Sequence, residues 1–597
     1  MAEALVRFLA AQENESGEPL FAGVWAIFGH GNVAGLGPAL HAARRRLAVF
    51  RAHNEQAMAH AAIAFSKAHA RRRIMACTTS IGPGATNMVT AAAVAHVNRL
   101  PVLFLPGDVF ASRRPDPVLQ QLEVFGEPSA SVNDCFRPVS RYFDRITRPE
   151  QILASLPAAL RVLLDPAECG PATLALPQDV QTEAFDYPAQ FFRRRSHSIR
   201  RPMPGAAELE AAAQHLRRAK KPLIIAGGGV KYALAEKRLA QFAEERGIPV
   251  AETQAGKGSL PWDHPCNVGA IGVTGSEAAN RLAASADLVL AVGTRLGDFA
   301  SGSRALFAQA KLVQLNVGAF DAAKHGAIAL VADADAGLEL LARELAGWRA
   351  SAAWTDQASR LTASWHRQVE RITSPGKGKP SDAQVLGVVN RALPKDSIVV
   401  CAAGGLPGEL HKLWRATDGA SYHLEYGYSC MGYEIAGGLG VKLARPEREV
   451  CVLVGDGSYL MLNSEIATSV ALGAKLVIVV LDNRGFGCIE RLQAATGGAS
   501  FNNLLDADAP RVDFAAHARS LGAEAQHVEI KDLAAAVERA LRARKTSVVI
   551  IDTDARRGTA EGGAWWDVAV TEAPRSSGQK KARAAYERAR RKQALGA

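Results

Sequence analysis

Two short polar motifs in the last third of the chain each follow an apolar run. The GDGS motif at 455–458 comes after the apolar run 450–454, and Asn483 follows the apolar run 476–481. Short runs rich in β-branched residues predict buried parallel strands, and open α/β sheets bind ligands at the carboxyl ends of such strands. Asp456 and Asn483 are 27 positions apart, which is about one strand–helix–strand unit. A carboxylate and an amide at neighbouring strand ends predict an oxygen site that suits Mg²⁺, although Gly-Asp-Gly alone is also common in turns.

Another candidate carboxylate lies far upstream. Glu55 follows a short predicted strand and opens an Ala-rich helix. Taken alone, it could be a solvated glutamate in a first helical turn, where negative charge is favourable. The segment 79–87, TSIGPGATN, forms another strand–turn–helix junction, in which Thr86 or Asn87 could cap the helix. This junction could also be a generic connecting loop.

The alternation of short apolar runs with helical segments predicts an α/β protein with three doubly wound parallel-sheet domains. The length of 597 residues also exceeds what one hydrophobic core usually serves. We expect an N-terminal domain over 1–195, a central domain over 203–350, a helical connector over 351–380, a C-terminal domain over 382–556 and a helical tail over 557–597.

A glycine-rich segment in the central domain invites a dinucleotide-binding interpretation. Residues 226–229, AGGG, follow the predicted strand 222–225. The GxGxxG spacing with an acidic residue after it is not clearly met, however. We therefore favour a structural role for these glycines, while a bound flavin or nucleotide stays open.

The composition bounds the class of protein. The net charge of +11 raises the possibility of nucleic-acid binding, but the basic residues of the tail alternate with Ala and Glu, as on a solvated helix face. We expect no nucleic acid and, because no apolar run could span a bilayer, no membrane as partner. The first eight residues predict an amphipathic helix rather than a signal peptide. Eight scattered cysteines without a CxxC pair predict reduced thiols and a cytoplasmic location.

The paired motifs resemble the diphosphate and metal motif of thiamine-diphosphate enzymes. The resemblance implies that Asp456, Asn483 and the backbone carbonyl of Gly485 ligate Mg²⁺, with thiamine diphosphate as the cofactor. It places Glu55 against the aminopyrimidine ring, where a hydrogen bond to a ring nitrogen favours the imino form that removes the thiazolium proton. The positions that it assigns to cofactor binding are Glu55, Gly404, Gly405, Met431, Gly432, Gly457, Ser458, Asn483, Gly485 and Phe486.

The same resemblance gives the segments roles. The N-terminal domain would bind the pyrimidine and the C-terminal domain the diphosphate, with Gly457 and Ser458 as donors at a helix beginning near Tyr459. Met431 would be an apolar wedge that presses the two cofactor rings together, although filling a core gap is the commoner role of methionine. In families with this arrangement the cofactor lies between two subunits. The resemblance therefore implies a homodimer or a dimer of dimers.

A closer resemblance spans nearly the whole chain. Segments such as FGHGNVAGLG, RAHNEQAMAHAAIAFSKA and LDNRGFGCIERLQ, together with the tail around GGAWWDV, resemble the trihydroxycyclohexane-1,2-dione hydrolase family of myo-inositol catabolism. That family is a ring-cleaving acylhydrolase family. The resemblance implies a small cyclic polyol diketone as substrate, hydrolysis of the bond between its two carbonyl carbons, and 5-deoxyglucuronate as product.

The reaction needs a proton-transfer group and polar contacts to a hydroxylated ring. His30 is the candidate for proton transfer, because an imidazole titrates near neutral pH. A purely structural hydrogen bond of His30 stays an alternative. Asn32, Arg113 and Gln120 are weaker candidates for contacts to substrate hydroxyls. An acetolactate-synthase-like carboligase or a 2-keto-acid decarboxylase is the alternative function with the same cofactor.

Overall fold

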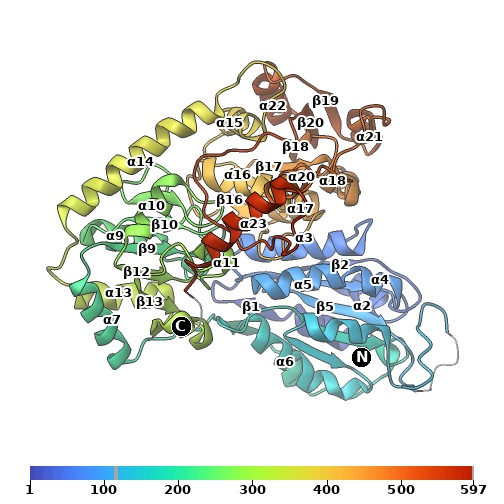
Figure 1. Ribbon diagram of the computed structural model, residues 1–597. Coiled ribbons are helices and arrows are strands. Elements are labelled where there is room, and N and C mark those ends of the chain that lie inside the picture. Colours follow the sequence, from blue (N-terminus) through green and yellow to red (C-terminus); the bar gives the residue numbers. More distant parts are fainter. Residues whose placement is uncertain (113–117, 595–597) are drawn as a thin grey trace. The chain divides into compact units, whose positions relative to one another are not determined.

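The structure is a computed structural model that describes residues 1–112 and 118–594 (Figure 1). The chain forms two compact units that are interleaved along the sequence. Unit 1 comprises Met1–Arg200, Gly427–Glu447 and Leu462–Leu476. Unit 2 comprises Arg201–Tyr426, Arg448–Met461 and Val477–Ala597.

Unit 1 is built on a six-stranded parallel sheet. In spatial order its strands are β3 (Ala48–Phe50), β2 (Phe21–Ala26), β4 (Ile74–Thr79), β5 (Leu103–Asp108), β7 (Ala172–Pro177) and β6 (Tyr142–Arg145). A small parallel pair joins β1 (Gln12–Asn14) to β8 (Arg195–His197). The helices of this unit are α1 (Ala2–Leu9), α2 (Leu36–Ala43), α3 (Glu55–Ala68), α4 (Pro83–Asn87), α5 (Val89–Asn98), α6 (Ile152–Leu163), α17 (Tyr433–Ala444) and α19 (Glu465–Ala471).

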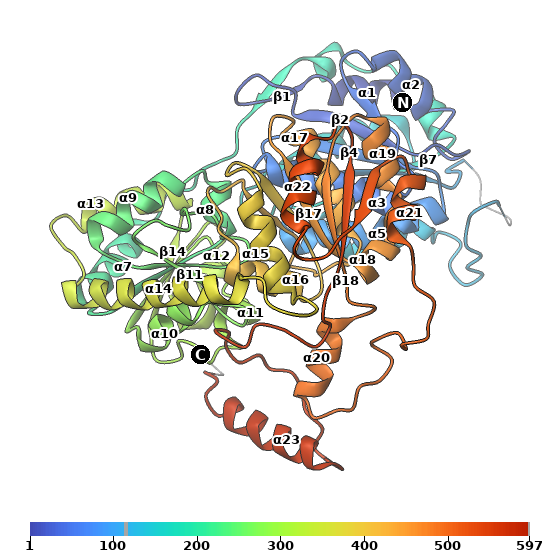
Figure 2. The ribbon, with the colours of Figure 1, turned by 90° about the horizontal axis from the view of Figure 1, so that it is seen from above.

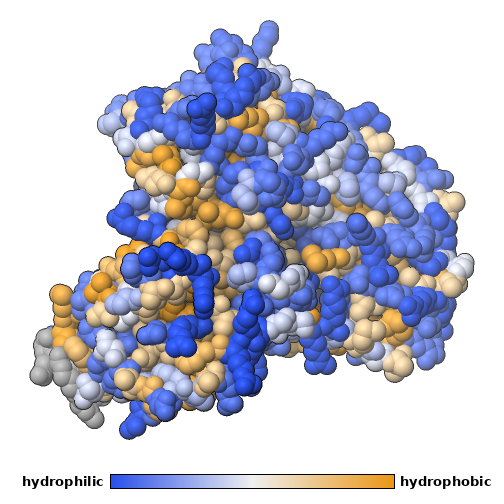
Figure 3. Space-filling view, turned by 180° about the vertical axis from the view of Figure 1, so that it is seen from behind, coloured by the Kyte–Doolittle hydropathy of each residue, from blue (hydrophilic) through white to orange (hydrophobic). Residues whose placement is uncertain are grey.

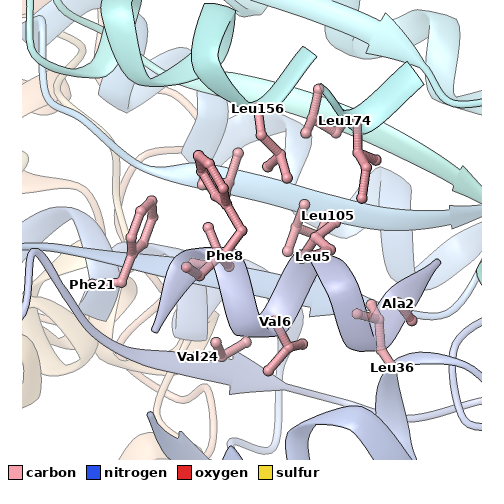
Figure 4. Close-up of a cluster of buried hydrophobic side chains, with 14 of the residues drawn as sticks. Ala2, Leu5, Val6, Phe8, Phe21, Val24, Leu36, Leu105, Leu156 and Leu174 are labelled. Carbon is pink, nitrogen blue, oxygen red and sulfur yellow. The ribbon is translucent and has the colours of Figure 1, made fainter. Parts of the chain in front are cut away.

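The core of unit 1 confirms the expected amphipathic N-terminal helix. Leu5 and Phe8 of α1 are fully buried, in a cluster that also contains Leu105 of β5 (Figure 4). Burial of each such side chain stabilises the fold by about 1.5–3 kcal/mol. The first residues of the chain are therefore an integral part of this core.

Helix α3 is buried on every side from Ala57 to Ser66 and is covered by α17 from the distant segment 427–447. The close approach depends on small residues. A Cβ atom added at Gly440 of α17 would overlap the carbonyl oxygen of Ala61 in α3. The Ala-rich sequence of α3 and the glycines of α17 thus allow two backbones to meet.

Unit 2 contains two six-stranded parallel sheets. The first sheet has the order β11 (Asn267–Ala270), β10 (Val250–Glu252), β9 (Pro222–Ala226), β12 (Leu288–Val292), β13 (Lys311–Asn316) and β14 (Ile328–Val331). The second has the order β16 (Tyr422–Leu424), β15 (Ile398–Cys401), β17 (Val450–Gly455), β18 (Val477–Asp482), β20 (Ser547–Asp552) and β19 (Glu524–His527). The three parallel sheets confirm the predicted α/β fold class.

The helices of unit 2 alternate with its strands. They are α7 (Ala206–Arg218), α8 (Gly228–Tyr232), α9 (Glu236–Arg246), α10 (Glu277–Ser285), α11 (Asp298–Ser301), α12 (Ala319–Ala322), α13 (Ala334–Glu344), α14 (Ala352–Thr373), α15 (Asp382–Ala392), α16 (Leu406–Leu413), α18 (Asp456–Met461), α20 (Gly487–Ala495), α21 (Phe514–Ser520), α22 (Leu533–Arg542) and α23 (Ser577–Arg590). The long yellow helix α14 lies within the segment 351–380, and the red helix α23 lies within 557–597 and buries none of its residues (Figure 2).

The glycine-rich segment after β9 serves chain packing. A Cβ atom at Gly227 would lie 2.5 Å from the carbonyl oxygen of Gly293, and one at Gly229 would lie 2.6 Å from the Gly293 Cα atom. The N–H of Gly229 donates to that same carbonyl over 2.9 Å. These glycines let the segments after the paired strands β9 and β12 approach each other closely, which supports the structural interpretation of the AGGG segment.

The surface and the thiols agree with the composition. Hydrophilic residues predominate on the face shown in Figure 3, with hydrophobic residues in scattered patches. All eight cysteines are described, and none forms a disulfide. Among the described helices, none combines the length and the apolar character needed to cross a membrane.

Candidate active site

The metal motif, defined as Asp456, Asn483 and Gly485, lies at the carboxyl ends of two adjacent strands in unit 2. Asp456 directly follows β17, and Asn483 directly follows β18, which pairs with β17 (Figure 2). The N–H of Gly485 donates to Oδ2 of Asp456 over 2.8 Å. This bond ties the two strand ends together, as the spacing of the motif predicts.

Two oxygen atoms of the metal motif have no hydrogen-bond partner among the described residues. These are Oδ1 of Asp456 and Oδ1 of Asn483, and both are buried. Buried polar atoms are nearly always paired, so two such atoms at neighbouring strand ends indicate a group that the protein itself does not supply. Carboxylate and amide oxygens are hard ligands that fit Mg²⁺. No cluster of three or more His, Cys, Asp or Glu side chains suited to a metal occurs in 1–112 or 118–594.

The electrostatics of Asp456 also fit a cation. Burial, with a smaller contribution from the charge of Asp482, raises the pKa of Asp456 to about 6. The N–H groups of Gly485, Asn483 and Gly457 act in the opposite direction without balancing the burial. A divalent cation beside this carboxylate would favour its charged form.

Gly485 is held in a conformation that glycine adopts most easily. Its φ of 145° and its backbone contact with the loop before Leu504 leave no room for a side chain. The N–H of Phe486 donates to the carbonyl of Asn503 over 2.7 Å. The segment after Asn483 is thereby pinned along 503–505, while the ring of Phe486 stays partly exposed.

Helix α18 begins at Asp456, three residues earlier than expected. The predicted start near Tyr459 is wrong, because Asp456 itself already adopts helical geometry at the end of β17. Gly457 and Ser458 therefore lie in the first helical turn. The N-terminus of a helix carries a partial positive charge, which favours a nearby anion.

The Gly404-Gly405 turn follows β15, which pairs with β17 in the same sheet. Gly404 has a φ of 82° and open space at its Cβ position. Gly405 lies against the guanidinium of Arg491, which also donates to the carbonyl of Ala555 over 2.6 Å. The sequence analysis missed Arg491, because Arg491 belongs to helix α20, which is distant in the sequence from the turn that it contacts.

In unit 1, Glu55 is the first residue of α3. Asn54 caps this helix by accepting the N–H of Ala57 over 3.0 Å. The Glu55 side chain is partly exposed, and its Oε2 accepts a hydrogen bond from Nδ2 of Asn87 over 2.9 Å. Asn87 therefore contacts the candidate catalytic carboxylate, a role that the sequence analysis did not assign to it.

His30 and Asn32 share the loop after β2 but differ in exposure. His30 is exposed, whereas Asn32 is buried. Oδ1 of Asn32 accepts the N–H of Gly29 over 2.9 Å, and its Nδ2 donates to Ile27 and Thr78, each over 3.2 Å. The amide of Asn32 is thus engaged in holding the loop that presents His30.

Ser80 links three loops at this edge of the sheet, since it follows β4, the neighbour of both β2 and β5. Its hydroxyl oxygen accepts the N–H of Gly31 over 3.3 Å, and its O–H donates to Oε1 of Gln120 over 3.4 Å. Gln120 is exposed and has a φ of 65°. Arg113, the remaining candidate for a substrate contact, lies outside the described residues.

Met431 and Gly432 form the turn before α17. Met431 is partly buried, and Gly432 has a φ of 89° at the N-terminus of the helix. A Cβ atom at Gly432 would lie 2.8 Å from Cδ1 of Leu462. Only glycine suits this turn, so the position of Met431 is fixed by the start of α17.

Three family profiles match the chain in succession. They are the thiamine pyrophosphate enzyme N-terminal TPP binding domain over 22–126, the central domain over 209–341 and the C-terminal TPP binding domain over 402–551. With its parallel sheets and its metal motif, the chain belongs to the thiamine pyrophosphate enzymes. Its cofactor is thiamine diphosphate.

Close relatives share almost the full length of the chain. The 3D-(3,5/4)-trihydroxycyclohexane-1,2-dione hydrolase of Geobacillus thermodenitrificans is 44% identical, over 96% of this chain and 95% of its own length. Proteins of the same name from Bacillus anthracis and Bacillus cereus are 43% identical, over 98% of this chain and 97% of their own length. The match confirms the resemblance drawn from the sequence motifs.

Proposed function

We propose that the protein is a thiamine-diphosphate-dependent hydrolase that opens trihydroxycyclohexane-1,2-dione between its two carbonyl carbons to give 5-deoxyglucuronate. The observation that carries this proposal is the 44% identity to a hydrolase of that name along nearly the whole chain. The unpartnered oxygens of Asp456 and Asn483 support the accompanying role of Mg²⁺. With Gly485, these residues would be the protein ligands of the metal.

The residues around the cofactor would bind and orient it. Gly404, Gly405, Gly457 and Ser458 would face the diphosphate, with Phe486 beside the metal motif. In the bound state thiamine diphosphate supplies a carbon nucleophile and an electron sink for carbon–carbon cleavage. Glu55 would hold a proton at a pyrimidine nitrogen. Met431, whose position is fixed by Gly432, would be the apolar wedge that presses the two cofactor rings together.

The residues toward the substrate would move a proton and bind hydroxyl groups. His30 is exposed at the end of β2, which supports its role in proton transfer. Gln120 and Arg113 would contact hydroxyl groups of the ring. Because the amide of Asn32 is engaged within the loop, we assign it to positioning His30.

Further properties belong to this proposal. The boundaries at 195, 203, 350, 382 and 556 would delimit the pyrimidine-binding, central and diphosphate-binding domains and the tail. Exposed hydrophobic side chains beside the metal motif, among them Phe486, support a homodimer or a dimer of dimers. The absence of disulfides among the eight described cysteines supports a cytoplasmic location.

A direct assay tests the proposal. The purified protein with thiamine diphosphate and Mg²⁺ is expected to remove the absorbance of the dione, and the Glu55→Gln variant is expected not to. Omission of either the cofactor or Mg²⁺ should also abolish the reaction. If the dione persists and pyruvate is converted to acetolactate, the protein is a carboligase instead.

A further inference from the structure

The two carboxylate oxygens of Glu55 have different surroundings. Oε2 accepts the 2.9 Å hydrogen bond from Nδ2 of Asn87. Oε1 faces the backbone of Gly84, where an added Cβ atom would come within 3.1 Å. One oxygen is therefore held by Asn87, while the other lies beside Gly84, where any larger residue would crowd it.

Asn87 is in place because of the turn before it. Gly82, with a φ of 67°, leads into α4, a short helix that begins at Pro83 and ends at Asn87. Gly84 must be glycine, because a Cβ atom there would overlap the hydroxyl oxygen of Thr79. The tight packing of this turn directs the exposed end of α4 toward the start of α3.

We propose that Asn87 is a positioning residue that selects which oxygen of Glu55 serves the cofactor. A carboxylate can rotate about its last side-chain bond, so its two oxygens are otherwise equivalent. By donating to Oε2, the Asn87 amide fixes this rotation and leaves Oε1 as the oxygen that meets the pyrimidine nitrogen. The inference rests on the proposed role of Glu55 in the function above, and it assigns a task to a residue outside the metal motif.

The first variant removes the amide and keeps the backbone. Asn87→Ala should slow the exchange of the thiazolium C2 proton with deuterium, measured by NMR after acid quench on the loaded protein without substrate. Loss of a hydrogen bond to a charged group predicts a decrease of about tenfold or more. Because the site that holds the diphosphate is on other residues, the dissociation constant for thiamine diphosphate, followed by tryptophan fluorescence, should change by less than about threefold.

Thr86 offers a matched control. It is the preceding residue of α4, it is also exposed, and its hydroxyl donates within the turn to the carbonyl of Pro83 over 3.0 Å. Thr86→Ala should leave both the exchange rate and the cofactor affinity near those of the wild type. The thermal midpoints of both variants should match the wild type, since neither side chain lies in the core.

The outcomes separate this inference from the proposed function. If Glu55→Gln slows exchange and Asn87→Ala does not, the positioning role of Asn87 is overturned while the role of Glu55 stands. Slow exchange in Asn87→Ala together with an equal loss in Thr86→Ala, or with a lowered thermal midpoint, would reduce Asn87 to a structural residue. If exchange is unchanged in Glu55→Gln itself, the proposed role of Glu55 fails first. The exchange assay contains no dione, so it does not depend on the substrate assignment.

Discussion

At the scale of single residues, the metal motif contains a buried carboxylate whose burial does not stabilise the fold. The carboxylate of Asp456 is buried beside the charge of Asp482, and one of its oxygens lacks a partner among the described residues. Such an arrangement destabilises the empty protein, and a bound cation would relieve it.

The pH dependence follows from the raised pKa of Asp456. The carboxyl has a pKa of about 6 when folded against 3.8 in its ordinary state, so the folded protein binds the proton more tightly. Its contribution favours folding below pH 4 and is lost as the pH rises through 6, with a total of about 3 kcal/mol at most. Asp456→Asn should therefore raise the thermal midpoint of the cofactor-free protein at pH 7 and abolish Mg²⁺-dependent cofactor binding. A lower midpoint in calorimetry would contradict this prediction.

Asn32 and His30 should differ in the effects of their removal. Asn32→Ala deletes three hydrogen bonds of a buried amide and should lower the free energy of unfolding by about 1–3 kcal/mol, with a fall in kcat. His30→Ala removes an exposed side chain and should lower kcat without changing stability. Urea unfolding and steady-state kinetics on the same preparations check both statements. Equal stability losses in the two variants would refute the distinction.

The sequence predicted the residues whose chemistry is local and missed those that act through distant contacts. Asp456 and Asn483 were recognisable because each directly follows an apolar strand. The bond from Asn87 to Glu55 joins residues that are 32 positions apart, and Arg491 reaches the Gly404-Gly405 turn from helix α20, which is distant in the sequence. Neither contact leaves a periodic signal in the sequence.

At the scale of elements, the apolar runs 450–454 and 476–481 located β17 and β18 to within one residue. The edge strands β6 and β19 gave no such signal, because Tyr142–Arg145 and Glu524–His527 contain no run of more than two apolar residues. The sequence analysis also did not predict the packing of α17 on α3. The two helices are hundreds of residues apart, and no sequence pattern indicates that they are in contact.

The α3–α17 contact gives a prediction about packing. Gly440→Ala would force a methyl group into the carbonyl of Ala61 and should lower the free energy of unfolding by about 1–3 kcal/mol. Gly126→Ala is the control, because its Cβ position has open space and its φ is not positive. Denaturant midpoints of the two variants should separate clearly. Identical midpoints would show that the helices can move apart at no cost.

At the scale of the whole molecule, hydrophobic side chains beside the metal motif are exposed in the single chain. They are Leu460, Met461, Phe486, Phe501 and Leu505. Their exposure is what an interface between subunits would cover. It fits the proposed homo-oligomer.

The mass in solution tests this surface. Light scattering should give two or four times the chain mass of 63.3 kDa. Phe501 is 76% exposed, so Phe501→Asp should leave the fold of the chain intact and shift the mass toward that of one chain. A wild-type protein that elutes as a single chain at micromolar concentration would remove the support for the oligomer.

The interleaving of the two units sets the order in which a newly made chain can finish folding. The ribosome delivers the first 200 residues, with α3 complete, long before it delivers α17 at Tyr433–Ala444. At ordinary rates of synthesis this interval is on the order of ten to fifty seconds. During that interval helix α3 lacks the contacts that α17 makes with it in the folded protein. We therefore expect the newly synthesised first unit to stay loosely packed, or to be bound by a chaperone, until α17 has been synthesised.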